Sequence, residues 1–317
     1  KVWAKLIKNY LNISYLYRFL SIANDFIIGG EEHSTNSSNT GSRDIFGYYY
    51  KFDCKVEFTE KQKNSGLKLL KNYGWDGKKK IVSLNIRDNI YLKSINKKID
   101  WGYHNYRNCE IRTFRKSVSW LIDQGYFVIR TGNLAKNKIN INNNNFLDYP
   151  FCKDKNSLFD LLLPSFSSYW IGSGFGLDEI PKLYKIPILY INFLPISSYN
   201  FYNDSETAPK KLIWNDTGKS LNVYEYMQNS YNKIQEYKEK NIRIVDLDEK
   251  EILEIIKDFF FRKRGNLNKE KREERFFKIY KKFYLKNYSS KHLLYKHINS
   301  RINLRWLEIS NKSFFPN

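Results

Sequence analysis

Residues 169–193, YWIGSGFGLDEIPKLYKIPILYINF, hold two apolar segments separated by a glycine loop and a short helical pattern. The segment YWIG at 169–172 predicts a short buried strand, and PILYIN at 187–192 predicts another. A strand, a glycine loop, a short helix and a second strand, in this order, are typical of a parallel βαβ unit. The glycines at 172, 174 and 176 leave two explanations open: a tight turn, or a loop whose bare backbone approaches a ligand.

The same alternation of strands and helices extends toward the N-terminus. Buried strands are predicted at 81–86 (IVSLNI) and 126–130 (YFVIR). A capping box at Thr59–Gln62 predicts a helix that ends at Gly74, and apolar residues at helical spacing predict another over 109–124. The predicted fold is α/β: a Rossmann-like parallel sheet domain over 59–262, preceded by a helix and loop at 1–58 and followed by a helical extension at 263–317.

The chain is strongly basic, with a net charge of +21 over 317 residues. Such a charge can favour nucleic acid or an anionic membrane surface. Here, however, the lysines are spread along the whole chain beside abundant Asn, Ile and Tyr, which is what an AT-rich coding sequence tends to produce. We therefore favour general composition as the explanation, keep a peripheral contact with an anionic membrane as the second, and expect no nucleic-acid partner.

The cysteines and histidines do not form a metal-binding pattern. The three cysteines include no CxxC pair and the four histidines include no HExxH spacing; they are Cys54, Cys109, Cys152, His33, His104, His292 and His297. The chain also lacks a DxD triplet at the predicted ligand edge, so neither a metal nor a cofactor is expected. Without a disulfide framework, a reducing, cytoplasmic location fits. The apolar segment 6–28 is interrupted by charged residues and predicts an amphipathic helix rather than a membrane span.

Polar or glycine residues follow each predicted strand. Arg87 and Asp88 follow the first strand, Arg130 ends the second with Gly132 behind it, and the glycine loop 172–176 follows the third. Because ligands of open α/β sheets bind beyond the carboxyl ends of the strands, these loops are expected to meet at one edge. Arginines, bare glycine backbone and a helix N-terminus suit a nucleoside diphosphate. No Walker lysine follows the glycines, which disfavours a P-loop NTPase.

The loop at 100–108, DWGYHNYRN, concentrates aromatic and basic side chains. Trp101, Tyr103, His104, Tyr106 and Arg107 lie within seven residues of one another. Aromatic rings beside a cation can hold a sugar or a base ring. Packing as a lid over the neighbouring loops is the alternative.

Several of these segments resemble one protein family. They are SRDI at 42–45, LNIRDNIYL at 84–92, YHNYRNCEI at 103–111, WLIDQGYFVIRTGN at 120–133 and the stretch 170–193. They resemble the patterns HVRD-x-x-YL, Y-H-x-YRN, V-x-R-x-G and IG-(T/S)-SSG-x-x-x-x-P of a bacterial family assigned as glycosyltransferases in surface-polysaccharide loci. The resemblance covers roughly residues 42–260.

The resemblance implies a GT-B glycosyltransferase, with two Rossmann-like domains and no metal required by the fold. The motif residues that it carries over are Arg87, Asp88, Tyr91, His104, Tyr106, Arg107, Asn108, Arg130, Gly132, Gly172, Ser173, Gly174 and Gly176. The chain departs from the pattern at Asn85, where the family has histidine, and in the less serine-rich glycine loop. A complete second Rossmann domain does not fit before residue 60, so either a truncated chain or a reduced acceptor half at 1–58 is expected.

The implied reaction transfers a sugar from a nucleoside-diphosphate donor to a glycan or lipid-linked acceptor. Arg87, Arg130 and the loop 172–176 would stabilise the leaving diphosphate, and Asp88 or His104 would be the general base. Asp88 could instead only orient Arg87 by a salt bridge. Glu179 could bond ribose or sugar hydroxyls, or could simply be a carboxylate favoured at a helix start.

A second, non-enzymatic function is kept beside this one. In it, the chain is an inactive or truncated basic α/β domain that binds an anionic polymer or a membrane surface through its charge. The transferase hypothesis predicts a cytoplasmic protein, with peripheral attachment at the inner face of the bacterial membrane as an accompanying expectation.

Overall fold

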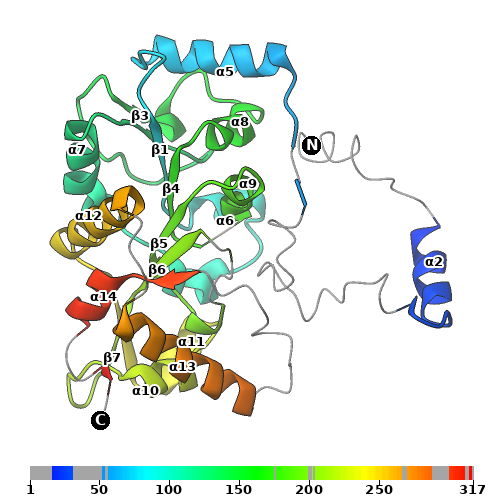
Figure 1. Cartoon of the computed structure of the whole chain (residues 1–317), viewed down its shortest axis with the longest axis vertical. Helices are drawn as coiled ribbons and strands as arrows, with labels where there is room; N and C mark the ends of the chain where they lie inside the picture. The colour runs from blue at the N-terminus through cyan, green and yellow to red at the C-terminus, as the bar shows by residue number, and fades with distance from the viewer. Residues whose placement is uncertain are drawn as a thin grey trace.

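One parallel sheet of seven strands forms the centre of the protein (Figure 1). The computed structural model describes residues 16–30, 52–53, 56–174, 176–198, 202, 204–265, 270–287, 300–310 and 314–315. The strand order is β3-β2-β1-β4-β5-β6-β9, and every neighbouring pair is parallel. The strands are β1 (Ile81–Asn85), β2 (Phe127–Arg130), β3 (Phe146–Asp148), β4 (Tyr169–Gly172), β5 (Ile188–Phe193), β6 (Ser205–Pro209) and β9 (Arg301–Ile302).

Helices cover both faces of the sheet, which explains why its central strands are apolar on both sides. On one face, α7 (Arg115–Asp123) and α12 (Glu249–Gly265) pack in the cluster that contains Val82 and Leu84 of β1. On the other face, α5 (Glu60–Asn72) and α8 (Phe159–Ser165) pack in the cluster that contains Ile81 and Phe127. Figure 1 shows α7 and α12 on one side of the strands and α8 on the other.

The remaining elements surround this core. They are α2 (Tyr17–Asn24), α6 (Ile90–Ile95), η2 (Trp101–Arg107), η3 (Ile111–Phe114), η4 (Tyr149–Phe151), η5 (Gly176–Asp178), α9 (Glu179–Leu183), η6 (Ile196–Ser198), α10 (Val223–Gln228), α11 (Ile234–Glu239), α13 (Lys271–Asn287), α14 (Leu304–Ile309) and the antiparallel pair β7 (Lys211–Trp214) and β8 (Ile242–Val245). Among the described residues, no helix has the length and hydropathy to cross a membrane. The segment 42–45, Cys54, His33, His292 and His297 lie outside the described residues.

The predicted α/β architecture is confirmed in its main features. The strands predicted at 81–86, 126–130, 169–172 and 187–192 correspond to β1, β2, β4 and β5. The capping box is present: the N–H of Gln62 donates to Oγ1 of Thr59, and the N–H of Thr59 donates to Oε1 of Gln62. The helix predicted over 109–124 begins as η3, continues as α7, and is followed by Gly125 at φ 85°.

The sequence patterns missed three strands of the sheet, β3, β6 and β9. The polar sequence of β6, SETAP, gave no strand signal, although all five of its residues are buried. The boundary drawn at residue 262 falls inside α12, and β9 comes from the segment beyond it. Residues 301–302 therefore belong to the central sheet, rather than to a helical extension outside it.

A buried network of charged and amide groups fixes this C-terminal segment to the sheet. A carboxylate oxygen of Glu273 in α13 lies 3.1 Å from Nη2 of Arg262 in α12, and the other lies 2.6 Å from Nη2 of Arg301 in β9. Asn303 donates to Oε2 of Glu206 in β6 at 3.0 Å. Burial disfavours the charge of Glu273, but its bonds with Arg301 and the charge of Arg262 outweigh burial and lower its pKa.

We expect Glu273→Gln to lower the free energy of unfolding by about 3–5 kcal/mol, because the buried guanidinium of Arg262 and the partly buried guanidinium of Arg301 each lose a carboxylate partner. Since the folded-state pKa of Glu273 is lowered, this contribution is present above the ordinary glutamate pKa and is lost as the pH falls through the lowered value. Urea denaturation at pH 7 measures the difference. The control is Glu274→Gln, at an exposed position of the same helix. Equal midpoints for the two variants would contradict the prediction.

Candidate functional site

A cavity lies at the carboxyl ends of β1 and β4, where the strand order of the sheet reverses. The chain passes from β1 through β2 to β3 on one side, and then crosses to β4 on the other side of β1. Such a switch point is where open α/β sheets bind ligands. The cavity has a volume of about 960 Å³ and is lined by residues of the loops after β1, β2, β4 and β5 and of α8 and α9.

The structure brings most of the residues singled out in the sequence to this cavity. Those that line it are Arg87, Asp88, Tyr91, Tyr106, Arg107, Arg130, Gly132, Gly174, Gly176 and Glu179. Those outside the lining are His104, Asn108, Gly172 and Ser173. The loops after the strands thus meet at one edge of the sheet, although two positions of the glycine loop, Gly172 and Ser173, do not line the cavity.

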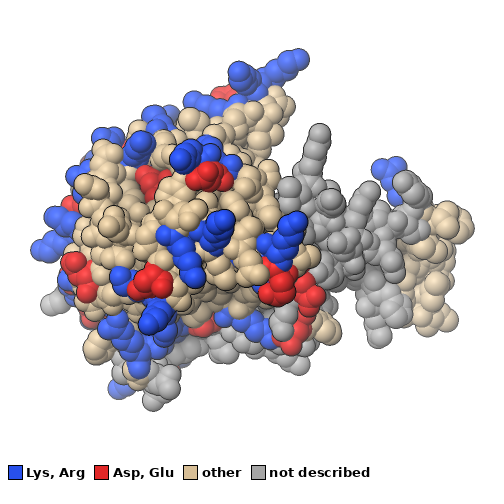
Figure 2. Space-filling model, turned by 90° about the horizontal axis from the view of Figure 1, so that it is seen from above, with Lys and Arg blue, Asp and Glu red and all other residues tan. Residues whose placement is uncertain are grey.

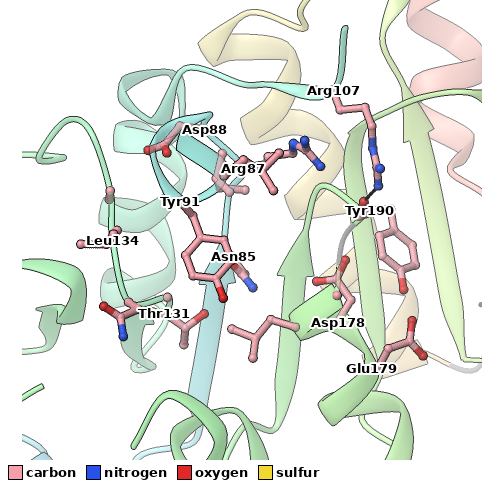
Figure 3. A pocket seen from close by; sticks show the side chains of 18 of the residues that line it. Asn85, Arg87, Asp88, Tyr91, Arg107, Thr131, Leu134, Asp178, Glu179 and Tyr190 are labelled. Atoms are coloured by element: carbon pink, nitrogen blue, oxygen red, sulfur yellow. Dashed lines mark hydrogen bonds between the residues drawn. The ribbon is translucent and has the colours of Figure 1, made fainter. Parts of the chain in front are cut away.

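Arg87 and Arg107 form a pair of cations at one side of the cavity (Figure 3). The backbone N–H of Arg87 donates to Oγ of Ser173 at 2.9 Å, and its Nε donates to Oδ1 of Asn108 at 3.4 Å. Nη2 of Arg107 donates to the carbonyl oxygen of Gly174, so the end of η2 is joined to the loop after β4. Oxygens of uncharged groups therefore hold both guanidinium groups in place.

These two cations lack an anionic partner in the described part of the chain. None of the ion pairs among the described residues includes Arg87 or Arg107. Nε of Arg107 is buried without a hydrogen-bond partner among the same residues. Burial, together with the neighbouring charge of Arg107, lowers the pKa of Arg87 to about 10. A bound anion would relieve this repulsion, and phosphate oxygens match the donor geometry of arginine.

The three glycines of the loop have different reasons to be glycine. A Cβ at Gly172 would lie 2.7 Å from Oδ1 of Asp178, which accepts a hydrogen bond from the indole of Trp170. Gly174 has φ 83°, and a Cβ there would lie 2.5 Å from the ring of Phe193. Gly176 has no such requirement, because none of the described atoms lies within 4 Å of the position of its Cβ. Packing or backbone conformation thus explains the glycines at 172 and 174. Of the three glycines, Gly176 is the one that packing against the described atoms does not explain.

Arg130 and Asp88 are both engaged within the protein. Nη1 of Arg130 donates to the carbonyl oxygen of Asn137 and lies 3.4 Å from Oδ1 of Asp148 in β3. The carboxylate of Asp88 accepts the N–H of Ile90 at 3.0 Å and that of Lys136 at 2.8 Å. Figure 3 shows its side chain directed away from the Arg87 guanidinium, and the ion pairs of the described residues include none between Asp88 and Arg87. Both residues also line a second cavity of about 270 Å³.

Part of the aromatic loop 100–108 is packed inside the protein. Tyr106 of η2 is buried, and its ring centroid lies 5.9 Å from that of Tyr237 in α11. His104 lies outside the cavity lining and places its ring 3.9 Å from that of Tyr103. Burial, followed by the positive charges of Arg87 and Arg107, lowers the pKa of His104. Its Nδ1 has no hydrogen-bond partner among the described residues.

Acidic, amide and basic groups line the rest of the cavity. Glu179, at the start of α9, is 2.7 Å from Nζ of Lys182, whose side chain is only 2% exposed. Asp160 of α8 and Asn133 of the loop after β2 also line the cavity, together with Asn85 at the end of β1. Lys182, Asp160 and Asn133 were not among the residues predicted to form the site. The available signals were local: Asn133 follows the strand predicted at 126–130, and Lys182 lies in the short helical pattern after the glycine loop.

No protein-family model, curated protein or solved structure matches this chain at a significant level. Within the described residues, no group of three or more His, Cys, Asp or Glu side chains is arranged to hold a metal ion. The candidate site is therefore defined by its own geometry. It is a switch-point cavity in which two arginines at one side have no carboxylate partner among the described residues, whereas the basic side chains elsewhere in the lining, Arg130 and Lys182, pair with carboxylates.

We expect Gly174→Ala to lower the free energy of unfolding by at least about 1 kcal/mol, since alanine is strained at this φ and meets the Phe193 ring. Gly176→Ala should leave it within about 0.5 kcal/mol of the wild type. Chemical denaturation of the two variants, which lie in the same loop, makes the comparison. Equal stability losses would show that the two glycines do not differ as described.

Proposed function

We propose that this protein is a glycosyltransferase that transfers a sugar from a nucleoside-diphosphate donor to a glycan or lipid-linked acceptor, as its sequence resemblance implies. The proposal rests on Arg87 and Arg107, which both line the switch-point cavity and have no carboxylate partner among the described residues. The Rossmann-like parallel sheet is consistent with a GT-B type enzyme, and we propose that architecture for the whole protein. Surface-polysaccharide synthesis at the inner face of a bacterial membrane is the setting that we propose.

The arginine pair would serve the leaving group in this reaction. An acceptor hydroxyl oxygen forms the new bond to the anomeric carbon, and the bond from that carbon to the diphosphate oxygen breaks. The electron pair leaves with the diphosphate, whose growing negative charge Arg87 and Arg107 would stabilise. Because two cations are available for this charge, we propose that the transfer is metal-independent.

Asp88 is the better of the two candidates for the general base that accepts the hydroxyl proton. It lines the cavity, whereas His104 does not. Both oxygens of Asp88 already accept one backbone N–H, which fixes the carboxylate and leaves further lone pairs on each oxygen. In this proposal Arg130 has a structural role through its ion pair with Asp148, and Arg87 and Arg107 contact the diphosphate.

The non-enzymatic alternative rests on overall charge. Figure 2 shows Lys and Arg scattered over the visible face with Asp and Glu among them, rather than gathered in one groove. A scattered charge favours weak, salt-sensitive binding to any polyanion. A specific ligand at the arginine pair would instead bind in a saturable, one-to-one manner. The two functions therefore differ in stoichiometry and in salt dependence.

We expect UDP or GDP to bind one to one, and Arg107→Gln to weaken that binding by about 10- to 100-fold, the effect of losing a charge-assisted hydrogen bond. Isothermal titration calorimetry measures both constants. The control is Arg112→Gln, in the neighbouring 3-10 helix, where the side chain is 60% exposed and pairs with Glu110. Binding to polyanions alone, with a steep salt dependence, would favour the alternative function. Equal effects of the two substitutions would remove the arginine pair from the site.

The pH dependence of binding gives a second test. In the free protein His104 has a lowered pKa, because of burial and of the two arginines. A bound diphosphate neutralises those arginines, so His104 takes up a proton more easily in the complex and then attracts the anion. The ratio of the dissociation constants of His104→Gln and of the wild type should therefore rise as the pH falls from about 8 to about 6. A ratio independent of pH would contradict this coupling; titration of the ligand itself cancels in the ratio.

A further inference from the structure

The cavity contains a buried amide group that no protein atom satisfies. Asn85 closes β1 and is only 3% exposed. Its Nδ2 has no hydrogen-bond partner among the described residues. Asn85 lines the cavity, as do Thr131 and Tyr91 (Figure 3). A buried donor without an acceptor destabilises the fold, so a ligand group that accepts from it would remove that penalty.

The same cavity contains an unsatisfied acceptor. Asp160, in the first turn of α8, accepts a hydrogen bond from Nδ2 of Asn133 through Oδ2, at 2.8 Å. Its Oδ1 is buried without a partner among the described residues. The hydroxyl of Tyr149 lies nearby, but donates to the carbonyl oxygen of Asn156 at 3.0 Å and accepts the N–H of Asn156 at 2.9 Å. Burial raises the pKa of Asp160, and its interactions with Asn133, Tyr149 and Lys155 offset this only in part.

A ligand group that fits here must both accept and donate hydrogen bonds. A phosphate would be repelled by Asp160, and an apolar group would leave both atoms unsatisfied. A hydroxyl accepts from an amide and donates to a carboxylate, and two neighbouring hydroxyls can do so at once. Thr131, Asn133 and Ser157 are further polar residues in the lining of the same cavity.

We propose that Asn85 and Asp160 form a subsite for the vicinal diol of a sugar ring. The proposal deepens the transferase function and rests on it for the orientation of the donor: the diphosphate lies at Arg87 and Arg107, and a hydroxyl-bearing ring lies at Asn85 and Asp160. That ring is either the ribose of the nucleoside or the sugar to be transferred, since both carry the same diol chemistry.

The test uses simple sugars, which need no nucleotide site. Saturation-transfer NMR of the full chain is recorded with ribose, with the methyl glycosides of glucose, galactose, mannose and N-acetylglucosamine, and with 2′-deoxyuridine. We expect saturable signals from ribose or from at least one glycoside, and an affinity at least tenfold weaker in Asp160→Asn and in Asp160→Leu. The control is Asp123→Asn, at an exposed position at the end of α7. Asn85→Ser gives a second variant, on the donor side of the subsite.

The outcomes separate the possibilities. Signals from ribose alone assign the subsite to the nucleoside, and signals from a glycoside assign it to a transferred or acceptor sugar; either result supports the diol. Absence of any sugar signal, or signals unchanged in folded Asp160 and Asn85 variants, overturns the proposal. A 2′-deoxyuridine signal that matches ribose and is lost in the variants would show a base-binding site and would also overturn it. Sugar binding without any binding of UDP or GDP would reject the transferase function and leave the diol subsite standing.

Discussion

The hydrogen bond from the backbone N–H of Arg87 to Oγ of Ser173 joins the two loops on which the candidate site depends. β1 and β4 are parallel neighbours with Asn85 opposite Gly172, so their loops leave the sheet at the same level. The bond holds these loops together where the strand order reverses, and Arg107 adds a second link to Gly174. Two cations are thereby kept close together against their mutual repulsion. Because the folded structure already holds the two cations in position, the binding of an anion would not have to organise the site.

The sequence predicted those parts of the fold that are governed by local patterns. Apolar runs gave β1, β2, β4 and β5, and the positions after them led to Arg87 and to the glycine loop. β6 was missed because its buried Glu206 accepts, through Oε2, a hydrogen bond from Asn303, which lies about a hundred positions further along the chain. Arg130 was predicted as a phosphate ligand and does line the cavity, but its ion pair with Asp148 was not predicted, because β3 was missed as well. Long-range partners of buried polar residues have no signature in the local sequence.

The site residues show the same limit. Arg107 was found because its motif is local, but its contact with Gly174 is not. Asp160 lies within SLFDLLL, which is read simply as a helix, and its exceptional environment comes from Asn133 on another loop. Asn85 looks like the polar end of a strand, and only the folded cavity shows that its amide nitrogen has no partner among the described residues. Whether a buried polar atom is satisfied is a property of the fold, and it marks ligand contacts more directly than residue type does.

The distribution of charge in the protein follows from how each cation is neutralised. Arg262 and Arg301 share the buried Glu273, and this pairing stabilises the packing of α13 and β9 against the sheet. Arg87 and Arg107 are the contrasting case, since the described residues offer them no carboxylate within ion-pair distance. Elsewhere in the cavity lining, the carboxylate of Asp160 would repel an anion, and the buried amide nitrogen of Asn85 lacks an acceptor among the described residues. In the binding mode that we propose, the charged part of a ligand lies at the two arginines and its hydroxyl-bearing part lies at Asn85 and Asp160. In this proposal, that polarity gives the cavity its chemical specificity, rather than the total charge of +21.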